Sequence, residues 1–259
     1  MFRKFLHSIS FSRKKRISKH AVDVMKVKLP PEIDTIRYRA FQGHVEDQVL
    51  WGMVLLDSVH VAPDIEDARR WFMIAANAGY ASGYTMMGRT YQIGYGALPD
   101  FSSAASYYEK AVLLGDDWGR YNLGILKMRG LGVQKDMKAA LSLFSEAAKN
   151  GHPKSMNLLA RFMEEGWETP RDPEGALVWY KASAEGGDYR GCHNYATALA
   201  AVGNMEEAQK WWERAIPDAT PDILQAMEKS FERLEKKVNA KLYDSLRVRL
   251  KDLRERQVI

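Results

Sequence analysis

The sequence contains a single cysteine, Cys192, among its 259 residues. One thiol excludes an internal disulfide and any metal site built on several thiolates, and it favours a reducing compartment. The apolar runs all fall short of the roughly 18 residues that a membrane-spanning helix needs. A secretory signal is not expected either, because no apolar segment of about 7–15 residues follows the first charges. These absences predict a folded, cytoplasmic protein.

Residues that carry chemistry are also sparse and scattered. No two of the six histidines stand four residues apart, and there is no HExxH motif, so neither a metal nor another cofactor is expected. Cys192 and His193 suggest a nucleophile and a base, but neighbouring helical residues point about 100° apart. Because Cys192 also occupies a small-residue register, we interpret it as a packed thiol. The sequence therefore predicts no catalytic residue and no enzyme.

The net charge of +5 is concentrated at the N-terminus. Residues 1–28 carry nine Lys or Arg side chains against Asp23 alone, so the remaining 231 residues carry a net charge of −3. A basic groove for nucleic acid is therefore not expected in the body of the chain. We interpret residues 1–28 as a basic, disordered tail. The alternative is a short interfacial helix in residues 1–20 that makes weak contact with an anionic membrane, since Phe2, Phe5, Leu6 and Ile9 share one helical face.

The main feature that is present is an internal repeat of 36 residues. Its glycines are Gly43, Gly79, Gly115, Gly151 and Gly187, and a small residue follows nine positions later at Gly52, Gly88, Gly124, Ala160 and Ala196. The same period is kept by aspartates (Asp64, Asp100, Asp136, Asp172), by alanines (Ala68, Ala104, Ala140, Ala176) and by large pairs (Trp71/Phe72, Tyr107/Tyr108, Leu143/Phe144, Trp179/Tyr180).

Each repeat is interpreted as two helices joined by a turn. The copy that begins at Trp118 has apolar residues at helical spacing as far as Met128, and Gly130-Leu131-Gly132 then breaks the helix. Asp136 is placed to cap the next helix, Met137–Lys149, and Gly151 is expected to end it in a left-handed conformation. Gly94-Tyr95-Gly96 lies in the equivalent turn, so we interpret both glycine pairs as hairpin turns and not as phosphate loops.

At these residues the sequence resembles the Sel-like repeat family of the tetratricopeptide-repeat superfamily. Asn122–Gly151 (NLGILKMRGLGVQKDMKAALSLFSEAAKNG) matches the family pattern nearly throughout, and the resemblance covers about Gly43–Ile216. It implies an all-α, right-handed superhelical solenoid of five hairpins with a partial unit before them, so that residues 29–216 form the repeat domain. The first unit departs from the pattern, because Ser58 and His60 replace the loop glycines. The last has a short loop at Ala201–Glu206.

Residues 217–259 are interpreted as an amphipathic C-terminal segment. Asp222–Glu255 is expected to form one long or kinked helix with a single apolar stripe, made of Ile223, Met227, Phe231, Leu234, Val238, Leu242, Leu246, Leu250 and Leu253. We interpret this helix as a cap on the last hairpin. The alternative is a helix for a coiled-coil partner or for self-association.

Although no catalytic site is evident, the resemblance implies a binding surface on the concave side of the solenoid. In solenoids of this type the first helix of each hairpin lines the concave side, so the residues three, six and ten positions after each glycine are expected to face inward. They form a mixed aromatic and basic set that can hold an extended peptide with an acidic group. The candidate partner-binding residues are Arg89, Trp118, Tyr121, Asn157, Arg161 and His193.

The resulting functional prediction is a non-enzymatic, bacterial scaffold or adaptor that binds another protein or peptide segment. Three alternatives remain open: a membrane-associated adaptor, an immunity-type inhibitor of a toxin or enzyme, and a hydrolase or transferase with its site in the concave groove. An enzyme should gather polar groups at one repeat, whereas the candidate residues spread over several. For each candidate residue, the alternative is an ordinary solvated helix position.

Overall fold

The computed structural model describes residues 28–57, 59–95, 97–234 and 238–255, and over these ranges it contains helices and no strand. This confirms the expected all-α fold. The described helices are α3 (Pro31–Phe41), α4 (Val45–Asp57), α5 (Ile65–Asn77), α6 (Ala81–Ile93), α7 (Phe101–Leu113), α8 (Asp117–Arg129), α9 (Met137–Lys149), α10 (Pro153–Glu165), α11 (Pro173–Glu185), α12 (Tyr189–Ala201), α13 (Met205–Ala215), α14 (Pro221–Leu234) and α15 (Ala240–Glu255).

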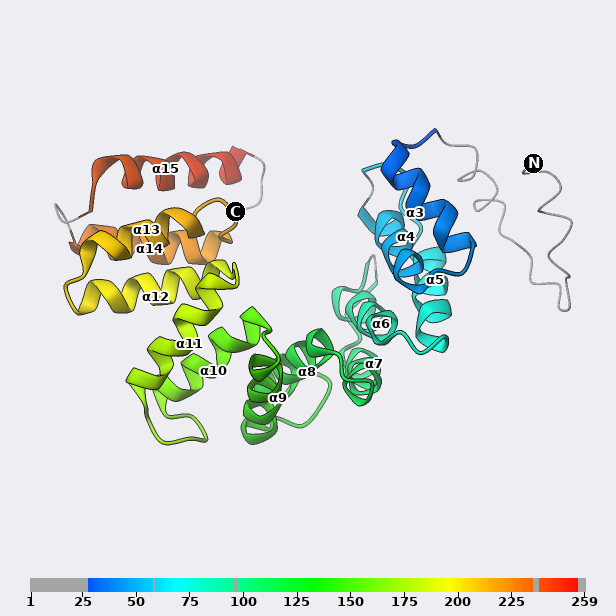
Figure 1. The fold of residues 1–259 in the computed structure, drawn as a ribbon, viewed down its shortest axis with the longest axis horizontal. Helices are drawn as coiled ribbons and strands as arrows, with labels where there is room; N and C mark the ends of the chain where they lie inside the picture. Colours follow the sequence, from blue (N-terminus) through cyan, green and yellow to red (C-terminus); the bar gives the residue numbers. More distant parts are fainter. Residues whose placement is uncertain (1–27, 58, 96, 235–237, 256–259) are drawn as a thin grey trace, which may run out of the picture. The chain divides into compact units, whose positions relative to one another are not determined.

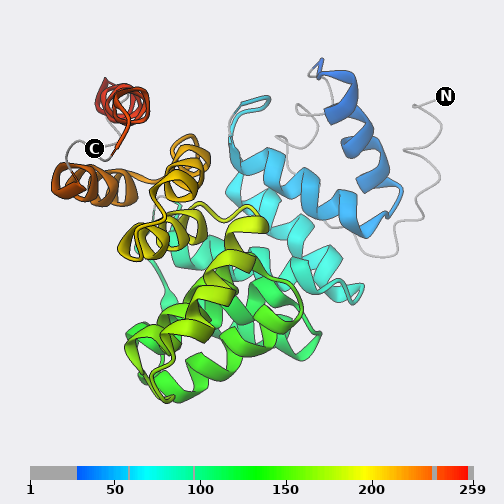
Figure 2. The ribbon, with the colours of Figure 1, turned by 60° about the vertical axis from the view of Figure 1, so that its left-hand side comes forward.

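The helices form two compact units, Met1–Tyr80 and Ala81–Ile259. In the first unit, α3 packs on α4 and α4 on α5. In the second, every helix from α6 to α13 packs on the next one along the chain, as Figures 1 and 2 show. The helices α4 to α13 are the five predicted hairpins, and α3 is the partial unit before them. The helical-repeat solenoid expected from the sequence is therefore confirmed.

The recurring glycine closes each hairpin as the sequence predicts. Gly151 has a φ of +93°, and its N–H donates to the carbonyl oxygen of Ala148 at 3.0 Å. The N–H of His152 donates to the carbonyl oxygen of Ala147 at 2.9 Å, which completes a Schellman motif. The same two bonds recur at the other period glycines. Glycine stands there because other residues adopt a positive φ only with strain.

The periodic aspartates begin the second helices. The side chain of Asp136 accepts a hydrogen bond from the N–H of Ala139 at 2.8 Å, and this satisfies one of the free donors at the start of α9. Asp64, Asp100 and Asp172 cap α5, α7 and α11 in the same way. The predicted caps are therefore confirmed.

The small-residue register lets an aromatic ring lie against the backbone of the first helix. A Cβ atom placed on Gly124 of α8 would lie 2.5 Å from Cε1 of Phe144 on α9, which is too close for any larger residue. Gly88 meets Tyr108 in the same way, and Gly52 meets Phe72. These rings are fully buried, so each of these three hairpins is held together by a ring that occupies the space left by a missing side chain.

The C-terminal segment differs from the sequence prediction: it forms two helices, α14 and α15, and not one (Figure 1). A new helix begins after Asn239, because the side chain of Asn239 accepts a hydrogen bond from the N–H of Leu242 at 2.7 Å and so caps α15. Its own N–H donates to Oε1 of Gln209 on α13 at 2.7 Å. The expectation of a single helix was wrong because it followed the apolar stripe and ignored this cap.

The break lets α14 and α15 pack on each other and on the last hairpin. Phe231 of α14 lies with its ring centroid 5.0 Å from that of Trp212 on α13, and both are buried in one core. The leucines Leu242, Leu246, Leu250 and Leu253 of α15 belong to the same core. The two helices therefore cover the end of the repeat.

No helix in the described ranges combines the length and the apolar character needed to cross a bilayer. The basic tail, with the membrane contact considered for residues 1–20, lies outside the described residues.

Candidate partner-binding surface

One face of the first helices carries the residues that the sequence singled out. We call it the first-helix face and define it by the positions three, six, ten and fourteen residues after each period glycine on α6, α8, α10 and α12. On α8 these positions fall on one side of the helix, because they are separated by three or four residues. They are Trp118, Tyr121, Ile125 and Arg129, and the indole of Trp118 is 47% exposed.

Three rings meet where α8 approaches α10. The ring centroid of Trp118 lies 4.6 Å from that of His152 and 6.1 Å from that of Tyr121, in both cases edge to face. The Tyr121 and His152 centroids are 5.4 Å apart. His152 precedes the first residue of α10 and is fixed by a 2.9 Å contact between its Nδ1 and the hydroxyl of Ser155. This packing holds Trp118 in place without covering it.

Cations gather where α10 approaches α12. Nζ of Lys154 lies 5.4 Å from the ring centroid of Tyr189 and 3.4 Å from Oδ1 of the buried Asp188. The guanidinium of Arg190 lies over the same ring at 4.7 Å, donates to its hydroxyl, and pairs with Asp222 at 3.9 Å. These side chains stay partly exposed although each has a partner.

Two predicted site residues are not on the surface, and for them the sequence interpretation was wrong. Asn157 is 5% exposed, and its Oδ1 accepts a hydrogen bond from Nδ2 of Asn194 at 2.7 Å, which ties α10 to α12. His193 is 8% exposed. The equivalent residue of α6, Thr85, is also buried and donates to Asp116 at 2.7 Å. The position six residues after the glycine therefore joins one first helix to the next.

Tyr121, at the same position, also has a packing role. Its ring is half-buried and lies 6.4 Å from that of Phe144, so it also packs inside its own hairpin. Arg89 and Arg161 are exposed as expected, and the Arg161 guanidinium lies 5.2 Å from the Trp167 ring. Trp118, Arg89 and Arg161 are thus the predicted residues that remain accessible.

The sequence analysis missed His152 and Tyr189, which support this surface: His152 is buried with its ring against that of Trp118, and the ring of Tyr189 lies near Lys154 and Arg190. They stand one and two residues after a period glycine, at positions that look like part of the turn. A signal was available, because the residue after the glycine is an aspartate in the flanking repeats (Asp116 and Asp188) and a histidine here. This histidine, His152, stands in the repeat whose neighbouring first helix carries Trp118 and Tyr121, and both of those rings pack against it.

Burial sets the protonation of this region. It lowers the pKa of His193 to about 4 and lowers the pKa of His152, so both rings are neutral at pH 7. Burial also raises the pKa of Tyr121, and the nearby positive charge of Arg190 opposes that effect. The positive charge of the surface therefore comes from Arg and Lys and not from histidine.

The protein is expected to lose stability as the pH falls from 7 to 5, with His193 as a main cause. The pKa of His193 is about 4 when folded and 6.5 in an exposed chain, so protonation favours the unfolded state. Its contribution is complete above pH 6.5 and is lost as the pH falls toward 4, with a loss of about 2 kcal/mol by pH 5. Urea unfolding at both pH values should show His193→Asn losing less stability than the wild type. An unchanged loss would contradict this assignment.

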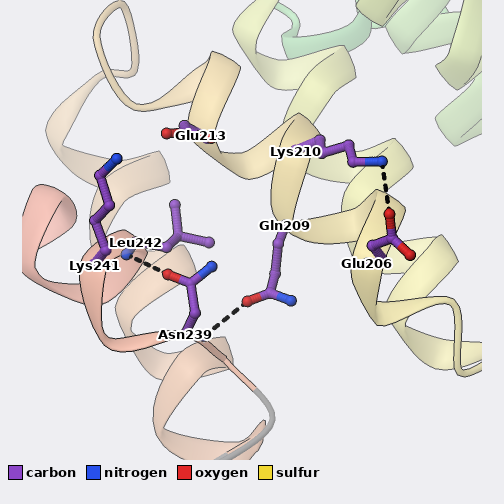
Figure 3. Close-up of a pocket in the computed structure, with 7 residues that line it drawn as sticks. All are labelled: Glu206, Gln209, Lys210, Glu213, Asn239, Lys241 and Leu242. Atoms are coloured by element: carbon purple, nitrogen blue, oxygen red, sulfur yellow. Dashed lines mark hydrogen bonds and ion pairs between the residues drawn. The ribbon is translucent and has the colours of Figure 1, made fainter.

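Neither the thiol nor the cavity of Figure 3 offers a reactive site. Burial raises the pKa of Cys192 to about 11, and its Sγ lies 3.6 Å from the carbonyl oxygen of Ala184, which confirms the packed thiol. The cavity, of about 320 Å³, lies between α13 and α15. Its lining is mainly charged and amide side chains of Glu206, Gln209, Lys210, Glu213, Asn239 and Lys241, whereas small-molecule sites have mostly apolar walls. Among the described residues, no three His, Cys, Asp or Glu side chains form a metal-binding group.

Comparison with known proteins identifies the repeat. The Sel1 repeat model matches residues 45–80, 81–116, 119–152, 153–188 and 194–216, which together make up more than half of the chain. The chain therefore belongs to the Sel1 repeat family. A search of curated proteins found no match.

Several solved structures share the fold. A Sel1 repeat protein from Oxalobacter formigenes is 21% identical, with a TM-score of 0.68 over 81% of this chain and 88% of that one. The protective antigen c5321 of uropathogenic Escherichia coli is 25% identical, with a TM-score of 0.60 over 83% of this chain and 46% of that one. Immunity protein PA5088 from Pseudomonas aeruginosa is 15% identical, with a TM-score of 0.56 over 90% of this chain and 85% of that one.

Proposed function

We propose that this protein is a non-enzymatic interaction scaffold that binds a segment of another protein on the first-helix face of α6, α8, α10 and α12. The observation that carries the proposal is Trp118, a large aromatic side chain that stays 47% exposed while Tyr121 and His152 hold its ring. Trp and Arg are the residues that most often dominate binding energy. A ring already fixed in position loses little entropy on binding.

The chemistry of this face favours binding over catalysis. Its titratable rings, His152 and His193, are buried and neutral, and the thiol of Cys192 is protonated at neutral pH. General acid–base catalysis needs a group whose pKa lies near the working pH and that can reach a substrate. The exposed side chains, Trp118, Arg89 and Arg161, instead offer contact area and hydrogen-bond donors.

Trp118→Ala is expected to weaken partner binding by about 2 kcal/mol, roughly thirtyfold. The test captures partners from the native cell extract with the full chain and compares the wild type with this variant. The matched control is Val178→Ala on the second helix α11, since that side chain is 67% exposed on another element. The proposal fails if Val178→Ala loses the captured protein and Trp118→Ala retains it.

An immunity-type inhibitor would be one form of the same function, with a toxin or an enzyme as the partner. One of the similar solved structures is immunity protein PA5088, and this is why we consider an inhibitor. The similarity between the two chains is one of fold. The protein captured in the preceding experiment decides it, because an inhibitor must suppress the activity of its partner. A partner without enzymatic or toxic activity would leave the scaffold without this role. A membrane-associated adaptor remains a further form, and it depends on residues 1–20.

A further inference from the structure

We infer that the partner segment on the first-helix face is acidic and carries an apolar side chain; this inference rests on the proposed function and names the chemistry of the partner. The second unit is nearly neutral, with 25 basic and 24 acidic residues in 81–259. The first-helix face, in contrast, has a net positive charge, because it carries several basic residues and one acidic residue, Glu165. The basic residues are Arg89, Arg129, Lys154, Arg161 and Arg190.

Three of these cations stand outside the ion pairs of the described residues. Arg89, Arg129 and Arg161 are exposed, and none of them forms an ion pair with a carboxylate of the described residues. Arg120, on another side of α8, shows the contrast, since it pairs with both Asp117 and Glu146. Uncompensated cations on one face create a positive potential that steers and orients an anionic partner.

The centre of the face can bind a carboxylate directly. The hydroxyl of Tyr121 makes no hydrogen bond to a described residue, and it lies within the electrostatic reach of Arg190 and Arg129. The carboxylate of Asp188 is within the same reach, but it is buried and paired with Lys154. A carboxylate at this point would accept from the hydroxyl and from a guanidinium, and hydrogen bonds between charged groups are stronger than neutral ones. The exposed indole of Trp118, whose ring meets that of Tyr121, would cover an apolar side chain of the same segment.

A protein segment fits these features better than a nucleic acid. Lys154 and Arg190 already have carboxylate partners, Asp188 and Asp222, so the strongest free charges are three arginines on three different helices. A nucleic acid needs many phosphate contacts and binds strongly basic surfaces, whereas this unit is almost neutral. A few carboxylates spaced along an extended segment match the few spaced arginines.

The test is selection of a displayed library of random 12-residue peptides against the full chain. Selected peptides should be enriched in Asp and Glu together with an aromatic or aliphatic residue. Arg161→Gln and Arg129→Gln should each weaken the best peptide about tenfold or more, and Trp118→Ala should weaken it as well. The matched control, Arg254→Gln on α15, should leave binding unchanged.

The other outcomes separate this inference from the proposed function. Neutral or basic peptides that still require Trp118 would overturn the acidic partner and leave the scaffold standing. Peptides that bind equally well to Trp118→Ala, Arg129→Gln and Arg161→Gln would overturn both. A labelled 20-base single-stranded DNA that binds the wild type more tightly than the best peptide at 150 mM salt would also overturn the acidic protein segment.

Discussion

Replacing Phe144 with alanine is expected to lower the free energy of unfolding by about 3–5 kcal/mol. The ring is fully buried, and it lies against the backbone of Gly124 and 5.8 Å from the ring of Phe162. Removing it leaves a cavity that glycine cannot fill, since Gly124 has no side chain to move. The loss of unfolding free energy should therefore lie in the upper part of the range observed for core substitutions. Urea unfolding followed by circular dichroism measures it.

The control for Phe144 lies on the same helix. Lys138 of α9 is exposed, so Lys138→Ala should change the free energy of unfolding by no more than about 0.5 kcal/mol. Equal effects of the two substitutions would mean that the contact between aromatic ring and glycine does not hold the hairpin together. The explanation of the 36-residue period would then fail.

Phe231→Ala is expected to cost a similar amount, about 3–5 kcal/mol, at the C-terminal end. Phe231 is buried on α14, with its ring 5.0 Å from Trp212 and 5.8 Å from Tyr243. It therefore joins the last hairpin to both C-terminal helices. The substitution should open this shared core, because α14 and α15 owe their order to the apolar surface that they cover.

Val248→Ala is the control for this second substitution. Val248 lies on α15 and is 68% exposed, so its truncation should leave the stability almost unchanged. A wild-type melting curve for Phe231→Ala would show that the C-terminal helices do not stabilise the repeat. It would favour the alternative that the sequence left open, a helix that binds a partner or a second copy of the chain.

The ends of the repeat helices could be predicted from the sequence because local interactions determine them. Gly151 must adopt a positive φ to close its hairpin, and Asp136 caps a helix that starts at the next residue. Both effects depend on a few neighbouring residues, so a pattern of residue types reveals them. The break before α15 depended on the Asn239 cap and on a contact with Gln209, which lies 30 residues away in the sequence.

Exposure on the first-helix face could be predicted only in part, because it depends on how successive hairpins stack. The sequence placed Trp118 and Arg161 on one face, and both are accessible. Asn157 and His193 share that face but are buried, and Asn157 is hydrogen-bonded to Asn194 of the next first helix. Helical periodicity gives the direction of a side chain. It does not show what the following repeat places over it.

Site-specific photo-crosslinking tests the central claim, that the first-helix face binds a partner, most directly. A photoreactive phenylalanine analogue is placed at Arg161, on this face, and in separate variants at Val178 of α11 and Val248 of α15. All three side chains are exposed, so the substitutions preserve the fold. We predict a covalent adduct with one partner protein from position 161 in living cells, and none with that protein from positions 178 and 248. Adducts with a partner from 178 or 248, together with none from 161, would contradict the account.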